Sequence, residues 1–323
     1  MLVRPPAVSV IIPVHNGAGT IAAALESVFR QTRRDFEVIV VDDGSDDREA
    51  LEQAMRRWRR QVHLLRQPNG GAGAARNLGI GMARATLLAF LDADDTWLPE
   101  FLDRQLELLE ARPELDMVWS DGWIAGDTPL AGRTFLQSTR ATAPPRFESL
   151  ARQTCTVLTS SVVIRKRVVE LVGGFDPAIR RGQDFELWLR VAHAGAVMAV
   201  RTEPLVWRRV HRANLSGDPA TELRRAIAVL GGLPAKLNLT RADARVLDSR
   251  IEQLACALEL ELAKTALRDG DTGAAQRHLT RTGAASSWKV KLTSLGLRVS
   301  PQLMRRLYVR STASAAVSTS PSA

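Results

Sequence analysis

The chain has 323 residues, enough for one large α/β domain and a smaller appendage, each with a core of its own. Its hydrophobic content of 45% and charged content of 24% are ordinary for a globular protein, whereas its net charge of +9 favours phosphate-bearing partners or reflects an arginine-rich compositional habit. The two cysteines, Cys155 and Cys256, lack CxxC spacing, so neither a disulfide framework nor a zinc site is expected, and a reducing cytoplasm fits.

The first half of the chain alternates short apolar runs with helical patterns. Strands are predicted at Val8–Val14, Phe36–Val41, Val62–Arg66 and Thr86–Leu91. Helices are predicted at Thr20–Gln31, Arg48–Arg60, Ala72–Ala83 and Leu98–Glu110. Strands that are apolar on both faces and separated by helices indicate an α/β fold, in which helices cover both sides of a mostly parallel sheet. Ligands bind such sheets at the carboxyl ends of the strands, so functional residues are expected there.

The second half of the chain is less regular. After the apolar run Met117–Ile124, the segment Asp127–Pro145 carries turn formers and is predicted to be a long loop. Regular patterning resumes at Val157–Ile164, followed by helices at Lys166–Leu171 and Gln183–His193 around a turn at Gly173–Pro177. From Ala220 onward Ala, Leu and Arg recur with helical periodicity, including a helical hairpin at Ala257–Leu279 that turns at Asp269-Gly270-Asp271. The predicted organisation is a first domain over residues 1–219, an all-helical extension over 220–310 and an unstructured tail over 311–323.

Membrane-spanning segments are not expected. The run Val8–Val14 is too short for a signal peptide and lacks a cleavage site, and no stretch approaches the roughly 20 apolar residues that cross a bilayer. The predicted location is therefore the cytoplasm, with peripheral contact at the inner face of the membrane as an alternative. The basic and apolar segments Trp288–Arg298 and Met304–Arg310 suit an anionic membrane, but a helix packed on the first domain with its basic face in solvent is the favoured interpretation.

Polar clusters follow three of the predicted strands. The first strand ends in Pro13–Gly17, the second in Val41–Asp47, and the fourth in the acidic loop Asp92-Ala93-Asp94-Asp95. Turn chemistry and helix capping account for Ser45–Asp47. They do not account for the acidic loop, because clustering three carboxylates costs repulsion that a turn does not need. A hard divalent cation removes that repulsion and prefers oxygen ligands, so we predict a metal site there.

An ordered set of motifs resembles family 2 glycosyltransferases of the GT-A fold. The set comprises VSVIIPVHNG, VIVVDDGSDD, NGGAGAARNLGI, FLDADDTWLP, GGFD and GQDFELWLR. The resemblance covers residues 7–216, with the motifs in the family's order, and excludes the C-terminal part of the chain. It implies a nucleotide diphosphate-sugar donor, usually a UDP-sugar, and a saccharide or lipid-linked acceptor.

The resemblance also implies a donor site. In that family the aspartate at the position of Asp43 bonds the nucleobase and the side chain at His15 packs beside it, although many members carry tyrosine there. Asp92 falls where the family contacts the ribose and the metal shell, and Asp94 where it binds the Mg²⁺ or Mn²⁺ that bridges the diphosphate. Asp95 is predicted to be a supporting or helix-capping carboxylate. The other residues predicted to contact the donor are Pro13, Asn16, Arg76, Asn77 and Ala93. His211 is predicted to be a further metal ligand.

Asp184 is predicted to be the catalytic base. The family carries an acidic pair before Leu-Trp; here Gln183 replaces the first acid and Asp184 keeps the second, which is the family's base. A carboxylate at this position accepts the proton of the acceptor hydroxyl as that hydroxyl attacks the anomeric carbon. The alternative is that Asp184 merely begins a helix. Glu186 is the weaker candidate, and Trp188 is either core or a sugar-stacking platform.

The predicted function is therefore inverting glycosyl transfer in cell-surface polysaccharide or glycolipid assembly. A sugar nucleotidyltransferase is the alternative enzyme, but it would want a lysine in the loop after the first strand, and His15–Gly19 has none. The run Gly70–Gly73 is not a dinucleotide fingerprint, because Arg76 stands where a small residue is required. The third alternative is a non-catalytic nucleotide-sugar-binding scaffold. Nucleic acid is not an expected partner, because no zinc finger or RNP-like pattern is present.

Overall fold

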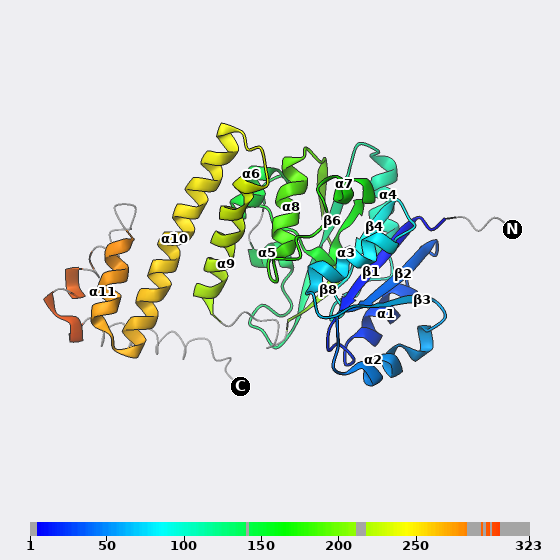
Figure 1. Ribbon diagram of the computed structural model, residues 1–323, viewed down its shortest axis with the longest axis horizontal. Helices are drawn as coiled ribbons and strands as arrows, with labels where there is room; N and C mark the ends of the chain where they lie inside the picture. Colours follow the sequence, from blue (N-terminus) through cyan, green and yellow to red (C-terminus); the bar gives the residue numbers. More distant parts are fainter. Residues whose placement is uncertain are drawn as a thin grey trace. The chain divides into compact units, whose positions relative to one another are not determined.

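The computed structural model of the protein describes residues 5–139, 142–210, 218–282, 292, 295–297 and 299–303 (Figure 1). The chain divides into two compact units. The first comprises residues 1–215 and 233–243, and the second comprises residues 216–232 and 244–323. The segment 233–243 therefore belongs with the first unit although it follows the first helix of the second. The domain boundary predicted after residue 219 stays a prediction.

An eight-stranded sheet forms the centre of the first unit, with its strands in the order β3-β2-β1-β4-β7-β6-β8-β5. β1 pairs in parallel with β2 and β4, and β2 pairs in parallel with β3, as the sequence predicts for the first half. The second half is mixed: β6 and β8 are parallel, whereas β7 is antiparallel to β4 and β6, and β5 is antiparallel to β8. The strands are β1 (Val8–Val14), β2 (Phe36–Asp42), β3 (Val62–Arg66), β4 (Leu87–Phe90), β5 (Thr96–Trp97), β6 (Met117–Gly126), β7 (Val163–Arg165) and β8 (Met198–Val210).

Helices cover the sheet on both faces. Those of the first unit are α1 (Ile21–Phe29), α2 (Arg48–Met55), α3 (Ala72–Met82), α4 (Phe101–Ala111), α5 (Phe135–Thr139), α6 (Phe147–Ala151), α7 (Lys166–Leu171) and α8 (Gln183–His193), with short 3₁₀ turns η1 (Arg56–Trp58), η2 (Thr159–Ser161) and η3 (Leu233–Ala235).

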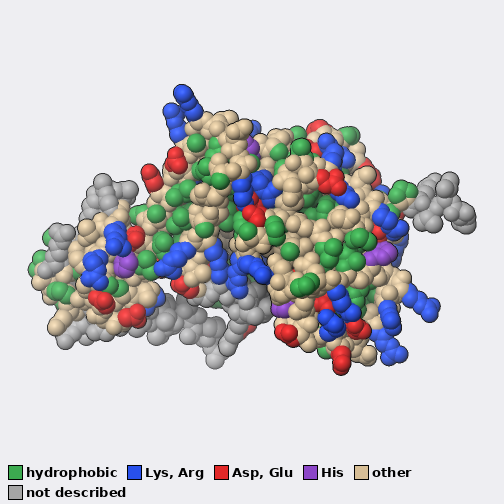
Figure 2. All heavy atoms as spheres, viewed as in Figure 1, with side chains coloured by type: hydrophobic (Ala, Val, Ile, Leu, Met, Phe, Trp, Pro, Cys, Tyr) green, Lys and Arg blue, Asp and Glu red, His purple; other side chains and the backbone are tan. Residues whose placement is uncertain are grey.

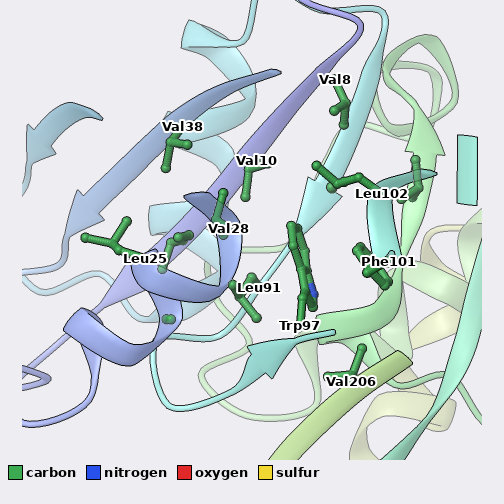
Figure 3. Close-up of a cluster of buried hydrophobic side chains, with 14 of the residues drawn as sticks. Val8, Val10, Leu25, Val28, Val38, Leu91, Trp97, Phe101, Leu102 and Val206 are labelled. Atoms are coloured by element: carbon green, nitrogen blue, oxygen red, sulfur yellow. The ribbon is translucent and has the colours of Figure 1, made fainter. Parts of the chain in front are cut away.

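The face that carries α1, α2 and α4 holds a large apolar cluster, the main apolar cluster of that face (Figure 3). Val8 and Val10 of β1 and Val38 of β2 point to it, together with Trp97 and Phe101, whose rings stack with centroids 4.2 Å apart. All seven residues of β1 are buried, as a central strand covered on both faces requires. This cluster fixes the register of the strands whose carboxyl ends carry the acidic loop.

The opposite face carries α3 and α8. Gly79 of α3 lies so close to β1 that a Cβ atom there would come within 2.6 Å of the Ile11 side chain. The ring of Trp188 on α8 lies 6.3 Å from that of Phe90 on β4, between centroids. Because Trp188 is buried in this contact, it is a core residue. The two helices are thereby fixed against strands that end at the predicted site.

The structure differs from the sequence prediction mainly in the second half. The 13-residue strand β8 was not predicted, because arginine, glutamate and proline interrupt its apolar residues. The predicted loop Asp127–Pro145 contains the short helix α5, and Val157–Ile164 forms a 3₁₀ turn and the start of β7. The predicted helix Arg48–Arg60 stops at Met55 and continues as the 3₁₀ turn η1.

The second unit is helical, with α9 (Pro219–Gly232), α10 (Arg241–Asp269) and α11 (Thr272–Arg281) as its described helices. The predicted turn between α10 and α11 is confirmed: the Asp271 side chain caps α11 by accepting a hydrogen bond of 2.7 Å from the Ala274 amide. Its small apolar core consists of Ala263, Ala266, Leu267, Ala275, Leu279 and Leu297.

No described helix combines the length and the apolar character that a membrane span requires. The segment Met304–Arg310 and the tail over 311–323 lie outside the described residues, as does most of Trp288–Arg298. Membrane contact through them stays a prediction. On the face drawn in Figure 2, Lys and Arg side chains lie among acidic and hydrophobic side chains.

Candidate active site

The acidic loop joins β4 to β5 at the edge of the sheet where the predicted site lies. It closes as a turn in which the Asp95 amide donates to the Asp92 carbonyl at 3.0 Å. Asp92 and Asp94 are half-buried, whereas Asp95 is buried. The three carboxylates are therefore not equivalent, because two of them keep part of their surface exposed and the third does not.

Asp95 is a supporting residue of the loop. Its carboxylate accepts hydrogen bonds from the Ser160 hydroxyl at 2.5 Å and from the Arg209 amide at 2.8 Å. Burial, together with the neighbouring charges of Asp92 and Asp94, raises the pKa of Asp95 to about 8. The expectation of a supporting role agrees with these contacts, and the capping alternative is wrong, because the partners of Asp95 lie on η2 and β8.

Asp92 is paired with Arg76 of α3. An Arg76 Nη2 hydrogen bond reaches Asp92 Oδ1, and the guanidinium lies 5.3 Å from the centroid of the Phe175 ring. The arginine side chain is buried, yet its Nε and Nη1 groups find no hydrogen-bond partner among the described residues. Leaving buried N–H groups unpaired is costly, so a ligand that brings oxygen acceptors fits here.

Asp94, a predicted metal ligand, and Asp92 lie together in the acidic loop. Asp92 and Asp94 supply oxygen donors of the kind Mg²⁺ and Mn²⁺ prefer. The described residues contain no group of three or more His, Cys, Asp and Glu side chains that could hold an ion. His211, the other predicted ligand, lies outside the described residues. The donor set is thus compatible with a cation that takes its remaining ligands from a diphosphate or from water.

Asp43 is buried at the end of β2 and organises the glycine-rich loop. Its carboxylate accepts hydrogen bonds from the Gln67 side-chain amide (Nε2) at 2.7 Å and from the backbone N–H groups of Gly70 at 2.8 Å and Gly71 at 2.7 Å. Gly71 begins α3 with φ of +87°, a conformation that glycine adopts without strain. A carboxylate offers about four acceptor positions, and these hydrogen bonds use three of those of Asp43.

The β1–α1 loop lies beside this carboxylate. His15 is exposed, and both of its ring nitrogens lie 3.2 Å from the side-chain nitrogen Nδ2 of Asn69. Asn16 adopts a left-handed φ of 52° and bonds through its own amide to the Ser45 hydroxyl and through its side-chain oxygen to the Asp46 N–H. These contacts bring the ends of β1 and β2 together, as the sequence predicts. The Asp47 side chain does not cap α2 but accepts a hydrogen bond from the Ala18 amide at 2.9 Å.

The remaining predicted donor residues have structural surroundings. Asn77 bonds both to the Phe175 amide at 2.8 Å and to the Phe175 carbonyl at 2.7 Å, which ties α3 to the turn before α8. Pro13 is buried in β1 and pairs in register with Val41. Ala93 packs against the main apolar cluster. Their assignment to the donor site stays a prediction.

Asp184 lies in the first turn of α8 and is held in place by Thr159. The Thr159 hydroxyl donates to Asp184 Oδ2 at 2.8 Å, and the Phe185 amide donates to Oδ1 at 2.8 Å. Its neighbour Gln183, which replaces an acid, is buried, and its Oε1 atom finds no partner among the described residues. Asp184 is half-buried, so its carboxylate is both oriented and accessible.

Glu186, the weaker candidate, belongs to a buried ion network instead. Arg190 donates to both of its carboxylate oxygens, at 2.9 and 2.7 Å, and Lys236 donates to one at 2.8 Å. Lys236 also bonds Asp176, and Arg190 donates to the Gly174 carbonyl at 2.6 Å. The network fixes the turn before α8 and the position of α8, so Glu186 is structural.

The turn η2 connects the two halves of the candidate site. Thr159 binds Asp184, while Ser160, the next residue, donates to Asp95 and accepts from the Asp92 amide at 3.2 Å. Sequence reasoning missed both hydroxyls, as it missed Lys236, because no local pattern marks a partner 25 to 68 residues away. The acidic loop and Asp184 are thereby brought to one place.

A surface cavity of about 440 Å³ lies elsewhere, between α2 and β3. Its lining includes Met55, Arg56, Arg59, Val62 and Leu64, none of which is a predicted site residue. The convergence of carboxylates, arginine and hydroxyls, rather than the size of a hollow, identifies the candidate active site.

Sequence comparison finds relatives across this region. The family model described as Glycosyl transferase family 2 matches residues 9–170. An uncharacterised glycosyltransferase of Rickettsia typhi is 28% identical over 240 residues, which cover 72% of this chain and 73% of that protein. WfgD of Escherichia coli, a UDP-Glc:alpha-D-GlcNAc-diphosphoundecaprenol beta-1,3-glucosyltransferase, is 26% identical over 225 residues, or 69% of this chain and 85% of that protein.

Structure comparison finds the same fold. S. aureus TarS 1–349 in complex with UDP-GlcNAc superposes with a TM-score of 0.63 at 15% identity, covering 95% of this chain and 92% of that one. The mannosyltransferase PcManGT from Pyrobaculum calidifontis, in complex with GDP-Man and Mn²⁺, superposes with a TM-score of 0.62 at 19% identity, covering 95% and 84%. A longer TarS chain is matched over 55% of its length. The expected GT-A fold, a mixed open sheet flanked by helices with a helical C-terminal region, is confirmed.

Proposed function

The chain belongs to glycosyl transferase family 2, and we propose that it moves a sugar from a nucleoside diphosphate-sugar to an acceptor hydroxyl with inversion. The observation that carries the proposal is the adjacency of Thr159 and Ser160, which joins Asp184 to the acidic loop. Relatives support the substrate class: WfgD takes a UDP-sugar, and the TarS and PcManGT structures hold UDP-GlcNAc and GDP-Man. We propose UDP as the nucleotide of the donor and polysaccharide or glycolipid assembly as the process that the transfer serves.

In the proposed reaction Asp184 accepts the proton of the acceptor hydroxyl. The hydroxyl oxygen forms a bond to the anomeric carbon while the bond from that carbon to the diphosphate oxygen breaks. The Thr159 hydroxyl holds Asp184 Oδ2, so Oδ1, whose other contact is the backbone amide of Phe185, is the oxygen we assign to the proton. No covalent intermediate is required, and the departing group is the nucleoside diphosphate.

Negative charge develops on the diphosphate as it departs, and Arg76 is the residue we assign to it. Its Nε and Nη1 nitrogens carry N–H groups without a partner among the described residues, and the pairing with Asp92 fixes the guanidinium beside the acidic loop. When bound by Asp94 and Asp92, Mg²⁺ or Mn²⁺ would neutralise part of the same charge. Asp43 is the proposed contact for the nucleobase.

The test is release of free nucleoside diphosphate from a panel of UDP-, GDP- and dTDP-sugars, each with Mn²⁺, with Mg²⁺ and with EDTA. Nucleoside diphosphate should be released from at least one donor, and EDTA should abolish that release. If EDTA leaves the release unchanged, the cation is removed from the proposal. Absence of release from every donor would refute the function.

Asp184→Asn separates catalysis from binding. The variant should bind the accepted donor with unchanged affinity by calorimetry and lose transfer by about 10²- to 10⁴-fold, because the amide cannot accept the proton. Asp103→Asn is the matched control, since Asp103 also lies in the first turn of a helix, α4, but is exposed there. Full transfer by Asp184→Asn would assign the base to another residue.

A further inference from the structure

Two tryptophans from neighbouring strands form a stacked pair at the surface of the first unit. Trp123 of β6 and Trp207 of β8 are paired in register, with ring centroids 6.0 Å apart and planes inclined by 29°. Trp207 keeps 41% of its surface exposed, whereas Trp97, Trp119 and Trp188 expose at most 4%. A large aromatic side chain left this exposed by the fold marks a binding surface rather than core.

The pair faces the side of the sheet opposite to the main apolar cluster. Val206 and Trp97 oppose each other across β8 and β5, and both belong to that cluster. Because side chains alternate along a strand, the next residue, Trp207, points to the other face, as does Trp123 beside it. This is the face on which α3 and α8 lie farther along the sheet, so the pair and the helix that carries Asp184 share one side.

The pair also borders the acidic loop. Thr96, the first residue after that loop, is the partner of Trp207 in the β5–β8 ladder. Two residues beyond Trp207, the Arg209 amide bonds Asp95 at 2.8 Å. The pair is therefore connected to the candidate active site by backbone pairing on one side and by a hydrogen bond on the other.

The order of the strands in the sheet places the tryptophan pair far from the proposed nucleobase contact. Asp43, the proposed nucleobase contact, follows β2, and β8 lies five strand positions away in the sheet. At about 4.8 Å per strand that separation is roughly 24 Å. Trp207 thus lies away from the base-binding end of the site and next to the acidic loop.

We propose that Trp207, backed by Trp123, is the platform on which the acceptor saccharide stacks; this inference rests on the proposed glycosyl transfer. One face of a pyranose ring presents C–H groups and its rim presents hydroxyls. An indole ring buries the C–H face and leaves the hydroxyls in water, so that they stay free to react. The acceptor this surface fits is accordingly a sugar ring rather than a protein side chain.

The test uses the wild-type enzyme with the nucleotide-sugar that passes the release assay and, as acceptor probes, the methyl glycosides of glucose, galactose, mannose and N-acetylglucosamine. Nucleoside diphosphate release is measured with and without each probe. Trp207→Leu removes the aromatic face but keeps apolar bulk, and Trp207→Tyr keeps an aromatic face. Leu171→Ala, at a side chain 75% exposed on α7, is the control for loss of exposed apolar surface.

Trp207→Leu is expected to raise the acceptor KM about tenfold, with a much smaller change in the donor KM, since a stacking contact is worth about a factor of ten. Trp207→Tyr should recover most of that loss, and Leu171→Ala should match wild type. Equal acceptor KM values in wild type and Trp207→Leu, with thermal melting confirming that both are folded, would overturn the inference. So would an equal rise in donor KM.

A wild-type enzyme that releases nucleotide from a donor but is stimulated by none of the four glycosides also overturns the platform as a site for a sugar ring. That result leaves the proposed function standing. Absence of release from every donor refutes the proposed function and the platform with it, so the two failures are distinguishable.

Discussion

Replacing Glu186 with glutamine preserves the shape of the side chain and removes the charge that Arg190 and Lys236 share. In the native protein the Glu186 and Arg190 side chains are 1% and 9% exposed, and two hydrogen bonds join them. After the substitution Arg190 stays buried with its charge no longer matched, and the glutamine amide directs an N–H group toward a donor. Breaking a buried ion pair from one side costs about 3–5 kcal/mol.

The chain contains a matched control for this experiment. Glu148 and Arg152 have the same four-residue spacing on a helix and the same contact from Arg Nε to Glu Oε1, 3.0 Å against 2.9 Å. Their side chains are 62% and 34% exposed, so solvent screens the pair and Glu148→Gln should cost less than about 1 kcal/mol. The difference between the two variants isolates the effect of burial.

The assay is thermal and urea unfolding followed by circular dichroism, with both variants compared with wild type at one pH and salt concentration. A loss of about 3–5 kcal/mol corresponds to a fall in Tm of roughly 6–20 °C for a unit of this size. Equal shifts for Glu186→Gln and Glu148→Gln, or a loss below about 1 kcal/mol for both, would refute the assignment of Glu186 to a buried structural network.

Two further predictions concern the helix α3 and the acidic loop. Gly79→Ala would place a Cβ atom 2.6 Å from the Ile11 side chain and should cost about 1–3 kcal/mol, whereas Gly81→Ala, which has open space in the same helix, should stabilise by up to about 1 kcal/mol; similar melting temperatures for the two would contradict the packing argument. The raised pKa of Asp95, about 8, means that the native state binds one more proton than the unfolded chain between about pH 4 and pH 8. Stability should therefore fall as pH rises through that window, by at most about 1.4 kcal/mol per unit. Asp95→Asn in EDTA should flatten the profile, and an unchanged slope would place the titrating group elsewhere.

The sequence predicts the first half of the fold well because three of its strands, β1, β2 and β4, are buried over most of their length. A strand such as β1, with seven buried residues, leaves an uninterrupted apolar run that periodicity detects. Apolar periodicity does not reveal β8, because part of this strand is exposed and carries charged residues. Backbone hydrogen bonds to the neighbouring strand, rather than apolar burial, hold that part of β8 in the sheet. Its pairing with β6 is long-range, and no local pattern encodes it.

The same distinction applies to the candidate site. The carboxylates of the acidic loop and Asp184 are recognisable by residue type and position after a strand or before a helix. The groups that orient them are not: Thr159 and Ser160 are ordinary hydroxyl residues until a short 3₁₀ turn brings them to Asp184 and Asp95. Likewise, Asp95 is buried whereas Asp92 is half-buried, and this difference follows from tertiary packing alone.

The bond between Asp95 and the Arg209 amide has a consequence for synthesis of the chain. These two residues are 114 positions apart, and β5, which begins directly after the acidic loop, pairs only with β8 among the described strands. At about 5–20 residues per second, the ribosome needs roughly 6–23 s to extend the nascent chain from one partner to the other. During that interval β1, β2, β3 and β4 can assemble, but the acidic loop lacks its C-terminal anchor. A nascent chain released early therefore carries the carboxylates without the geometry that makes them useful.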